Sequence, residues 1–148
     1  MYTIGQVAKM FDLPTSTLRY YDKQGLFQQL IRESGIRKFS ENEIEALRVI
    51  ECLKKSGLEI KDIKLFMDWC AEGPATYSDR FQLIRNQKER VEAEIKQLHK
   101  TLDMLKFKCW YYSKAMEDGN EDTAKASIPD GLPEDIRVAY DNSHTQSS

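Results

Sequence analysis

Apolar residues recur at helical spacing near the start of the chain and predict two short helices joined by a tight turn. The first opens at Thr3, with a glutamine three residues later in the spacing of a capping box. Pro14 separates it from a second helix over residues 15–22, in which Leu18 and Tyr21 share the inward side. Two such helices, the second with a polar outer face, are typical of a helix-turn-helix.

The next stretch predicts a small β-hairpin. Leu30-Ile31 and residues 36–39 are short runs that contain apolar residues, and Glu33-Ser34-Gly35 between them has the composition of a turn. This hairpin, or wing, would carry Arg37 and Lys38 on its returning arm. A plain loop with solvated charges is the alternative.

Two further helices complete the predicted domain, which covers residues 1–73. Ser40 and Glu43 form a second capping-box pattern, which opens a helix that ends at Ser56-Gly57. A fourth helix is predicted from about residue 59 to 71, and Gly73-Pro74 closes the domain.

Residues 74–116 follow a heptad pattern, with apolar positions at alternating steps of four and three and Lys88 as the polar interruption. The positions of this seam are Tyr77, Phe81, Ile84, Lys88, Val91, Ile95, Leu98, Leu102, Leu105, Cys109, Tyr112 and Met116. A helix about 60 Å long cannot bury so narrow a stripe against itself, so a second copy of the chain is the expected partner. Packing onto the N-terminal domain is the alternative. The fold class is therefore mainly α: a winged helix-turn-helix followed by a long coiled-coil dimerisation helix.

Residues 117–148 are acidic and polar, and we expect a flexible tail with one short helix near 134–140. The tail holds eight acidic residues against two basic ones, whereas residues 1–40 hold six basic residues against three acidic ones. The N-terminal end is thus the part suited to a polyanion.

Composition narrows the class of protein further. No apolar run approaches the roughly 20 residues of a membrane span and no secretory signal opens the chain, so we expect a cytoplasmic protein with no membrane partner. The three cysteines are widely spaced and odd in number, which favours reduced thiols. No phosphate loop, nucleophile triad or carboxylate pair indicates an enzyme or a cofactor, and no catalytic residues are expected.

The outer side of the 15–22 helix carries Thr15, Ser16, Arg19 and Tyr20. Hydroxyl and guanidinium groups bind phosphate oxygens and read base edges, so this helix is the candidate DNA contact. An architectural or excisionase-like DNA-binding protein without an effector would share this feature, but such proteins are generally short and lack the long seam.

In this order of elements, the chain resembles the MerR family of bacterial transcription regulators. The segments that carry the resemblance are Thr3–Ala8, Thr17–Asp22, Gly25-Leu26, Gly35–Phe39 and Gly57–Ile63, within residues 1–116. Two positions depart from the family pattern: Pro14 replaces a usual Ser or Thr cap, and Phe39 replaces a usual Tyr, which removes a hydroxyl from any phosphate contact there.

The resemblance implies a homodimer with antiparallel long helices that binds a palindromic promoter. It also implies that the regulator activates transcription by distorting an overlong promoter spacer. RNA polymerase would then be an indirect partner, affected through the shape of the DNA. Arg19 and Tyr20 would grip phosphate or reach bases, Tyr21 would pack with its hydroxyl toward phosphate, and the wing would clamp the flanking backbone. The implied DNA-binding residues are Ser16, Thr17, Arg19, Tyr20, Tyr21, Lys23, Arg37 and Lys38.

The effector is the least determined feature. Cysteines do not converge near the ends of the long helix, so we expect no metal site. Cys52 resembles the single reactive cysteine of the aldehyde- and thiol-stress-responsive branch of the family, with Lys54 and Lys55 nearby to favour a thiolate. A packed core thiol is the alternative for Cys52, and packing is the expectation for Cys70 and Cys109.

A small apolar effector is the other possibility for the signal. Aromatic residues are dense in two segments that an antiparallel dimer would bring together, where they would form either a cage or a dimer core. They are Phe66, Trp69, Phe107, Trp110, Tyr111 and Tyr112.

Overall fold

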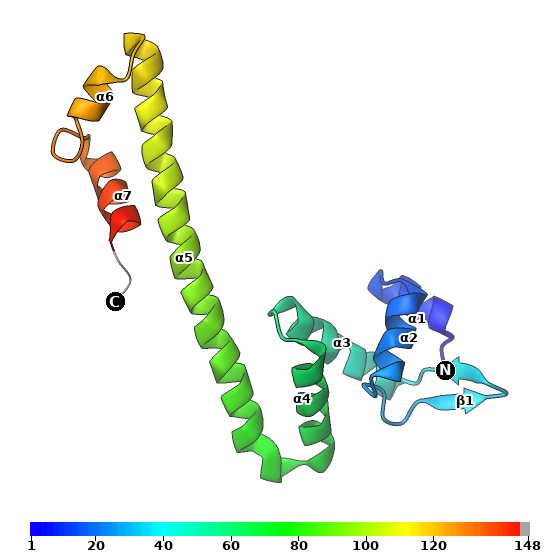
Figure 1. Cartoon of the computed structure of the whole chain (residues 1–148). Helices are drawn as coiled ribbons and strands as arrows, with labels where there is room; N and C mark the ends of the chain where they lie inside the picture. The colour runs from blue at the N-terminus through cyan, green and yellow to red at the C-terminus, as the bar shows by residue number, and fades with distance from the viewer. Residues whose placement is uncertain (146–148) are drawn as a thin grey trace. The chain divides into compact units, whose positions relative to one another are not determined.

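The computed structural model describes residues 1–145 and is mainly helical, with a two-stranded sheet (Figure 1). Its elements are α1 (Ile4–Phe11), α2 (Thr15–Lys23), β1 (Ile31–Glu33), β2 (Ile36–Lys38), α3 (Glu41–Lys55), α4 (Ile60–Glu72), η1 (Pro74–Thr76), α5 (Tyr77–Asp118), α6 (Asp122–Ala126) and α7 (Glu134–His144). The predicted fold class is confirmed. No helix within the described range is both long and apolar enough to cross a bilayer.

Local sequence signals account for the ends of the first helices. Thr3 and Ser40 both form capping boxes, with Gln6 and Glu43 as their partners, and so fix the starts of α1 and α3. Gly25 adopts a φ of 80°, and the Leu26 amide donates to the Tyr21 carbonyl at 3.0 Å, which ends α2.

The predicted wing is present. Strands β1 and β2 pair antiparallel, with Arg32 opposite Arg37, and the turn residues Ser34 and Gly35 both have positive φ (52° and 79°). Two successive positive φ angles match the turn that suits the right-handed twist of a hairpin. Phe39, just after β2, is completely buried and packs edge-on against another core aromatic ring, so this position is a core residue and not a phosphate contact.

The chain divides into two compact units, and the first is Met1–Glu89. Its core is formed by buried apolar residues from every helix of the predicted domain, including Val7, Leu18, Tyr21, Leu47 and Ile63. The unit extends past the predicted boundary at 73 because the first turns of α5 pack on it. Gln87 is buried and donates to the Ser56 carbonyl at 2.6 Å.

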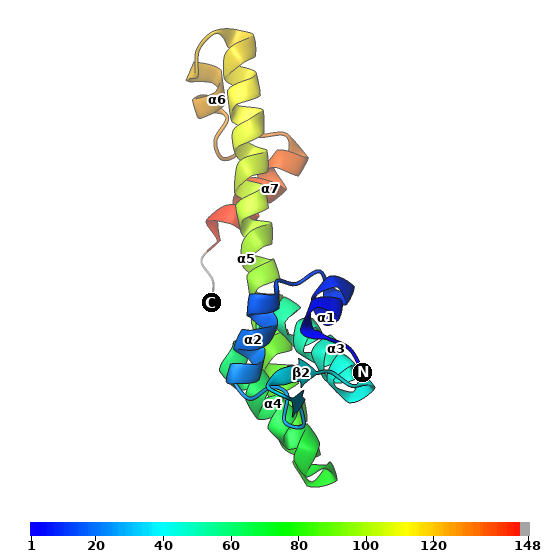
Figure 2. The same ribbon diagram turned by 90° about the vertical axis from the view of Figure 1, so that its right-hand side faces the viewer.

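The second compact unit begins at Arg90. Its C-terminal part differs from the flexible tail that we expected. The described part of the tail forms α6 and α7, which fold back along α5 (Figures 1 and 2). Phe107 of α5 packs with Leu132 and Ile136 in a small hydrophobic cluster. The tail's acidic composition obscured these apolar residues, which recur at a helical interval. The predicted helix near 134–140 is confirmed as α7, and residues 146–148 lie outside the described part of the chain.

Candidate nucleic-acid interface

Helix α2 separates its two faces as its sequence predicts. Leu18 and Tyr21 are buried, whereas Ser16, Arg19 and Tyr20 are exposed. An Arg19 guanidinium nitrogen lies 3.4 Å from Thr15 Oγ1, one turn earlier on the same helix. Lys23 is also exposed, and Thr17 is half-buried.

The N-terminus of α2 is suited to an anion. Its N-cap residue is Pro14, and no side chain caps this helix end. The Thr17 amide donates to the Pro14 carbonyl at 3.1 Å. The amides of Thr15 and Ser16 precede it at the positive end of the helix dipole, where a phosphate oxygen is a favourable acceptor.

Tyr21 was predicted to pack inward with its hydroxyl toward phosphate; it is buried as predicted, but its hydroxyl is engaged within the chain. Its hydroxyl donates to Glu51 Oε1 at 2.8 Å and accepts from Lys54 Nζ at 3.0 Å. The pKa of the Tyr21 phenol is raised overall, chiefly by burial. The hydrogen bond from Lys54 lowers this pKa, and Glu51 raises it. Tyr21 therefore holds α2 against α3 from the inside. The sequence feature that indicated this inward orientation is the three-residue spacing of Leu18 and Tyr21 on the apolar side of the helix.

The two predicted basic residues of the wing lie on its opposite faces. Arg37 turns to α2, where its Nε donates to Asp22 Oδ2 at 2.7 Å, so the prediction that it clamps DNA is not supported by this geometry. Successive residues of a strand point to opposite faces. Lys38 accordingly shares the other face with Ile31, its partner across the hairpin, and is half-buried.

All three cysteines are exposed in the single chain, which corrects the expectation that Cys70 is packed. Cys109 lies on the seam of α5, so its packing stays a prediction for the dimer. Cys70 lies beside a guanidinium, with Arg80 Nη1 at 3.7 Å from its Sγ, a contact that the sequence did not reveal. Lys54, expected to act on the Cys52 thiol, instead bonds to Tyr21. No cluster of potential metal ligands occurs among residues 1–145.

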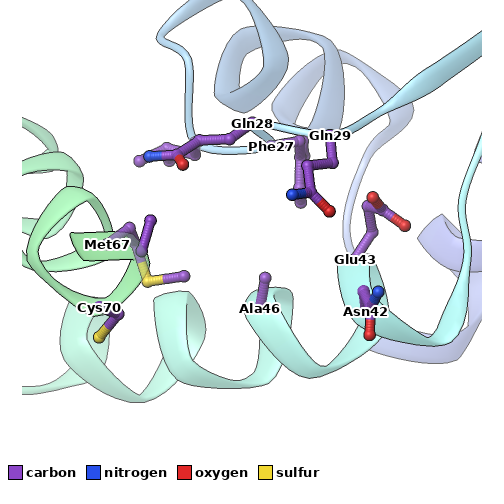
Figure 3. Close-up of a pocket in the computed structure, with 10 residues that line it drawn as sticks. Phe27, Gln28, Gln29, Asn42, Glu43, Ala46, Met67 and Cys70 are labelled. Atoms are coloured by element: carbon purple, nitrogen blue, oxygen red, sulfur yellow. The ribbon is translucent and has the colours of Figure 1, made fainter. Parts of the chain in front are cut away.

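A groove of about 440 Å³ lies between the segment after α2, helix α3 and helix α4 (Figure 3). Its walls include Phe27, Ala46 and Met67, with Gln29 and Glu43 as polar neighbours. The sequence did not reveal this groove, because its lining comes from three separate segments.

Three of the four aromatic residues predicted on α5 for a cage or dimer core lie in a cluster within the chain instead, whereas Tyr112 is exposed. Phe107, Trp110 and Tyr111 join a cluster within the chain, and the Phe107 and Tyr140 rings lie 4.9 Å apart between centroids. The pKa of Tyr111 is raised by desolvation and by Glu121. These rings thus serve to hold the tail on α5.

The apolar stripe of α5 remains uncovered. Its large members are between 40% and 80% exposed, and they are Tyr77, Phe81, Ile84, Ile95, Leu98, Leu102, Leu105, Tyr112 and Met116. Phe107, which packs against the tail, lies off this stripe, so the fold-back of the tail leaves the seam open.

Comparison with known proteins finds relatives that are described as HTH-type transcriptional regulators. Residues 2–69 match the sequence model of a protein family that is described as the MerR HTH family regulatory protein. An uncharacterized HTH-type transcriptional regulator of Haemophilus influenzae is 36% identical over 120 residues, which span 80% of this chain and 89% of that protein. The regulator AdhR of Bacillus subtilis is 35% identical over 89 residues, which span 60% of this chain and 64% of AdhR.

Two solved structures share both fold and sequence. HiNmlR, a MerR family regulator lacking the sensor domain, bound to promoter DNA, aligns over 82% of this chain and 98% of its own, with a TM-score of 0.66 and 34% identity. A MerR family regulator from Bacillus thuringiensis aligns over 73% and 96%, with a TM-score of 0.61 and 45% identity. The chain belongs to the MerR family, and it is a DNA-binding transcriptional regulator, not an enzyme.

Proposed function

We propose that the protein is a homodimer that binds an inverted repeat in a promoter and activates transcription by distorting the spacer DNA. The observation that carries this proposal is the uncovered seam of α5, whose large apolar members are 40–80% exposed in the single chain. Monomeric proteins rarely leave so extended an apolar surface in water. A second α5, paired antiparallel, is the occupant that a heptad pattern favours.

Each protomer would place α2 in a major groove. Arg19 and Tyr20 would grip phosphate or reach base edges, and Lys23 would add a cation at the end of the same helix. The uncapped start of α2, with Ser16 and Thr17, would receive a phosphate. Two α2 helices related by the two-fold axis of a dimer require a site with the same symmetry.

Activation would follow from deformation of the promoter. A spacer that holds the −35 and −10 elements too far apart can be bent and untwisted until RNA polymerase engages both. Such a deformation costs several kcal/mol, which contacts to the DNA backbone must repay. HiNmlR, which shares 34% identity with this chain, is described as bound to promoter DNA, which supports the choice of ligand.

Cys52 is the proposed site of a thiol-reactive effector. Its thiol is exposed, as a sensor requires. It also follows Glu51 on α3, and Glu51 accepts the hydrogen bond from Tyr21 of α2. A bulky or charged adduct at Cys52 would form next to the contact that positions the DNA-binding helix.

The groove of Figure 3 supports a second candidate, a small apolar effector. Its volume of about 440 Å³ lies within the range of small-molecule sites, and Phe27, Ala46 and Met67 give it apolar walls. An effector in this groove would contact both α3 and the segment that follows α2.

The experiment that tests the proposal selects binding sites for the purified protein from a random duplex pool and measures its mass by sedimentation. A dimer that recovers an inverted repeat, and that raises run-off transcription from a promoter carrying it, is the expected result. A monomer, or recovered sites without dyad symmetry, contradicts the homodimer. DNA bending with no change in transcription indicates an architectural protein.

A further inference from the structure

Asp22, near the end of α2, joins the DNA-binding helix to both strands of the wing. Its Oδ2 accepts from Arg37 Nε of β2 at 2.7 Å, and the same oxygen accepts from an Arg32 guanidinium nitrogen of β1. The Asp22 side chain is only 7% exposed. The three residues therefore form one cluster with two cations on a shielded carboxylate.

Each member of this cluster depends on the others for a favourable environment. Arg32 and Arg37 lie directly opposite each other in the hairpin, where like charges repel. Asp22 occupies the last turn of α2, whose carbonyl end disfavours a negative charge. A shielded carboxylate also needs cations to replace its water. The pairing satisfies all three requirements, and it fixes the wing relative to α2.

We propose that Asp22 is a positioning residue that determines DNA specificity by holding Arg32 and Arg37 away from the phosphate backbone. Arginines that reach phosphate raise the affinity for every duplex alike, because that contact carries no sequence information. With both guanidinium groups on Asp22, binding depends more on the outer face of α2. This inference rests on α2 being the DNA contact of the proposed function.

The test uses the full-length protein, the duplex that it selects from a random pool, and a scrambled duplex of the same composition. Asp22→Asn keeps the size of the side chain but removes the charge that holds the arginines. We expect the affinity for the scrambled duplex to rise roughly tenfold at 0.1 M salt, and the ratio of specific to non-specific affinity to fall. The plot of log affinity against log salt should steepen by about 0.9 for each arginine released.

Matched variants separate this effect from a general change in charge. Glu33→Gln removes the same charge from the same wing, at a residue paired with Ile36 rather than with an arginine, and should leave the affinity ratio nearly unchanged. Replacing Arg32 and Arg37 by Gln in the Asp22→Asn background should return the salt dependence to that of the wild type. A merely structural role for Asp22 would not produce this reversal.

Arg32→Gln provides a second measurement should Asp22→Asn fail to fold, because Arg37 still pairs with Asp22 in that variant. Its salt dependence should equal that of the wild type, whereas a decrease of about 0.9 per protomer would place Arg32 on phosphate and overturn the inference. Equal scrambled-duplex affinities for Asp22→Asn and Glu33→Gln would also overturn it. Arg19→Ala serves as the reference: if it leaves the salt dependence unchanged, the proposed α2 contact is wrong instead.

Discussion

The hydroxyl of Tyr21 donates a hydrogen bond to Glu51 Oε1 at 2.8 Å, and this bond joins the inner side of α2 to α3. Lys54 Nζ donates to the same hydroxyl at 3.0 Å and lies 5.4 Å from the centre of the Tyr21 ring. The preceding residue, Tyr20, is 48% exposed. Two adjacent tyrosines therefore have different roles, one internal and one available to DNA.

Tyr21→Phe should lower the free energy of unfolding by about 1–2 kcal/mol, because it removes the hydroxyl and deprives Glu51 and Lys54 of a partner. Tyr20→Phe is the matched control and should change that free energy by less than about 0.5 kcal/mol. Urea denaturation followed by circular dichroism measures both. Equal losses of stability in the two variants would show that the internal hydrogen bonds contribute nothing.

Alkaline pH should weaken the fold through the same contact. Burial raises the pKa of Tyr21 above its usual value near 10, and the hydrogen bond to Tyr21 raises the pKa of Lys54. The folded state then holds protons that the unfolded chain has lost, so the free energy of unfolding falls as the pH rises above about 10. Tyr21→Phe should make this fall shallower when urea denaturation is repeated between pH 8 and pH 11.

Features that depend on local sequence could be predicted. The capping boxes at Thr3 and Ser40 satisfy helix amides from three residues away, and the turn at Ser34-Gly35 depends on adjacent residues alone. The inward pairing of Leu18 with Tyr21 was predicted as well, yet Tyr21 was still assigned to DNA from the family resemblance. The helical period was the better guide, since it indicated that this side chain faces the core.

Features that depend on residues distant in sequence could not be predicted in the same way. The pairing of Asp22 with Arg32 and Arg37 joins residues ten and fifteen positions apart and requires the angle between wing and helix. The strand period of two places Arg37 and Lys38 on opposite faces, yet both were assigned to the DNA contact. The fold-back of the tail depends on contacts of Phe107 with Leu132 and Ile136. The acidic composition of the tail gave no indication of these contacts.

Arg19→Ala should weaken binding to every duplex and lower the salt dependence of binding by about 0.9 per protomer, because the predicted contact is to phosphate. Arg85→Ala removes the same charge from an exposed position on α5, where Arg85 pairs with Glu89, and should have little effect. Fluorescence anisotropy at several salt concentrations gives both quantities. An unchanged affinity and slope for Arg19→Ala would remove this residue from the contact.

Cys52→Ser should abolish the promoter response to an aldehyde or an oxidant while leaving DNA affinity intact, since the serine cannot form the adduct. Cys70→Ser and Cys109→Ser test the other exposed thiols and should retain the response. Run-off transcription with and without the reagent, together with mass mapping of the modified residue, provides the measurement. A response that persists in Cys52→Ser excludes this residue as the sensor.

Leu102→Asp should convert the dimer to monomer, because it would bury a carboxylate in the apolar seam on both helices. Leu102 is 60% exposed in the single chain, so the substitution leaves the core of the protomer intact. Lys96→Asp introduces the same carboxylate at an exposed α5 residue outside the seam and should remain dimeric. Sedimentation equilibrium distinguishes the two states.

The loss of the dimer should also reduce affinity for the selected inverted repeat far more than affinity for an isolated half-site. A dimer gains its second half-site contact within one complex, at a high effective concentration, whereas a monomer must bind each half-site separately. If Leu102→Asp stays dimeric, or becomes monomeric yet binds the inverted repeat as tightly as the wild type, then the seam does not pair the DNA-binding units.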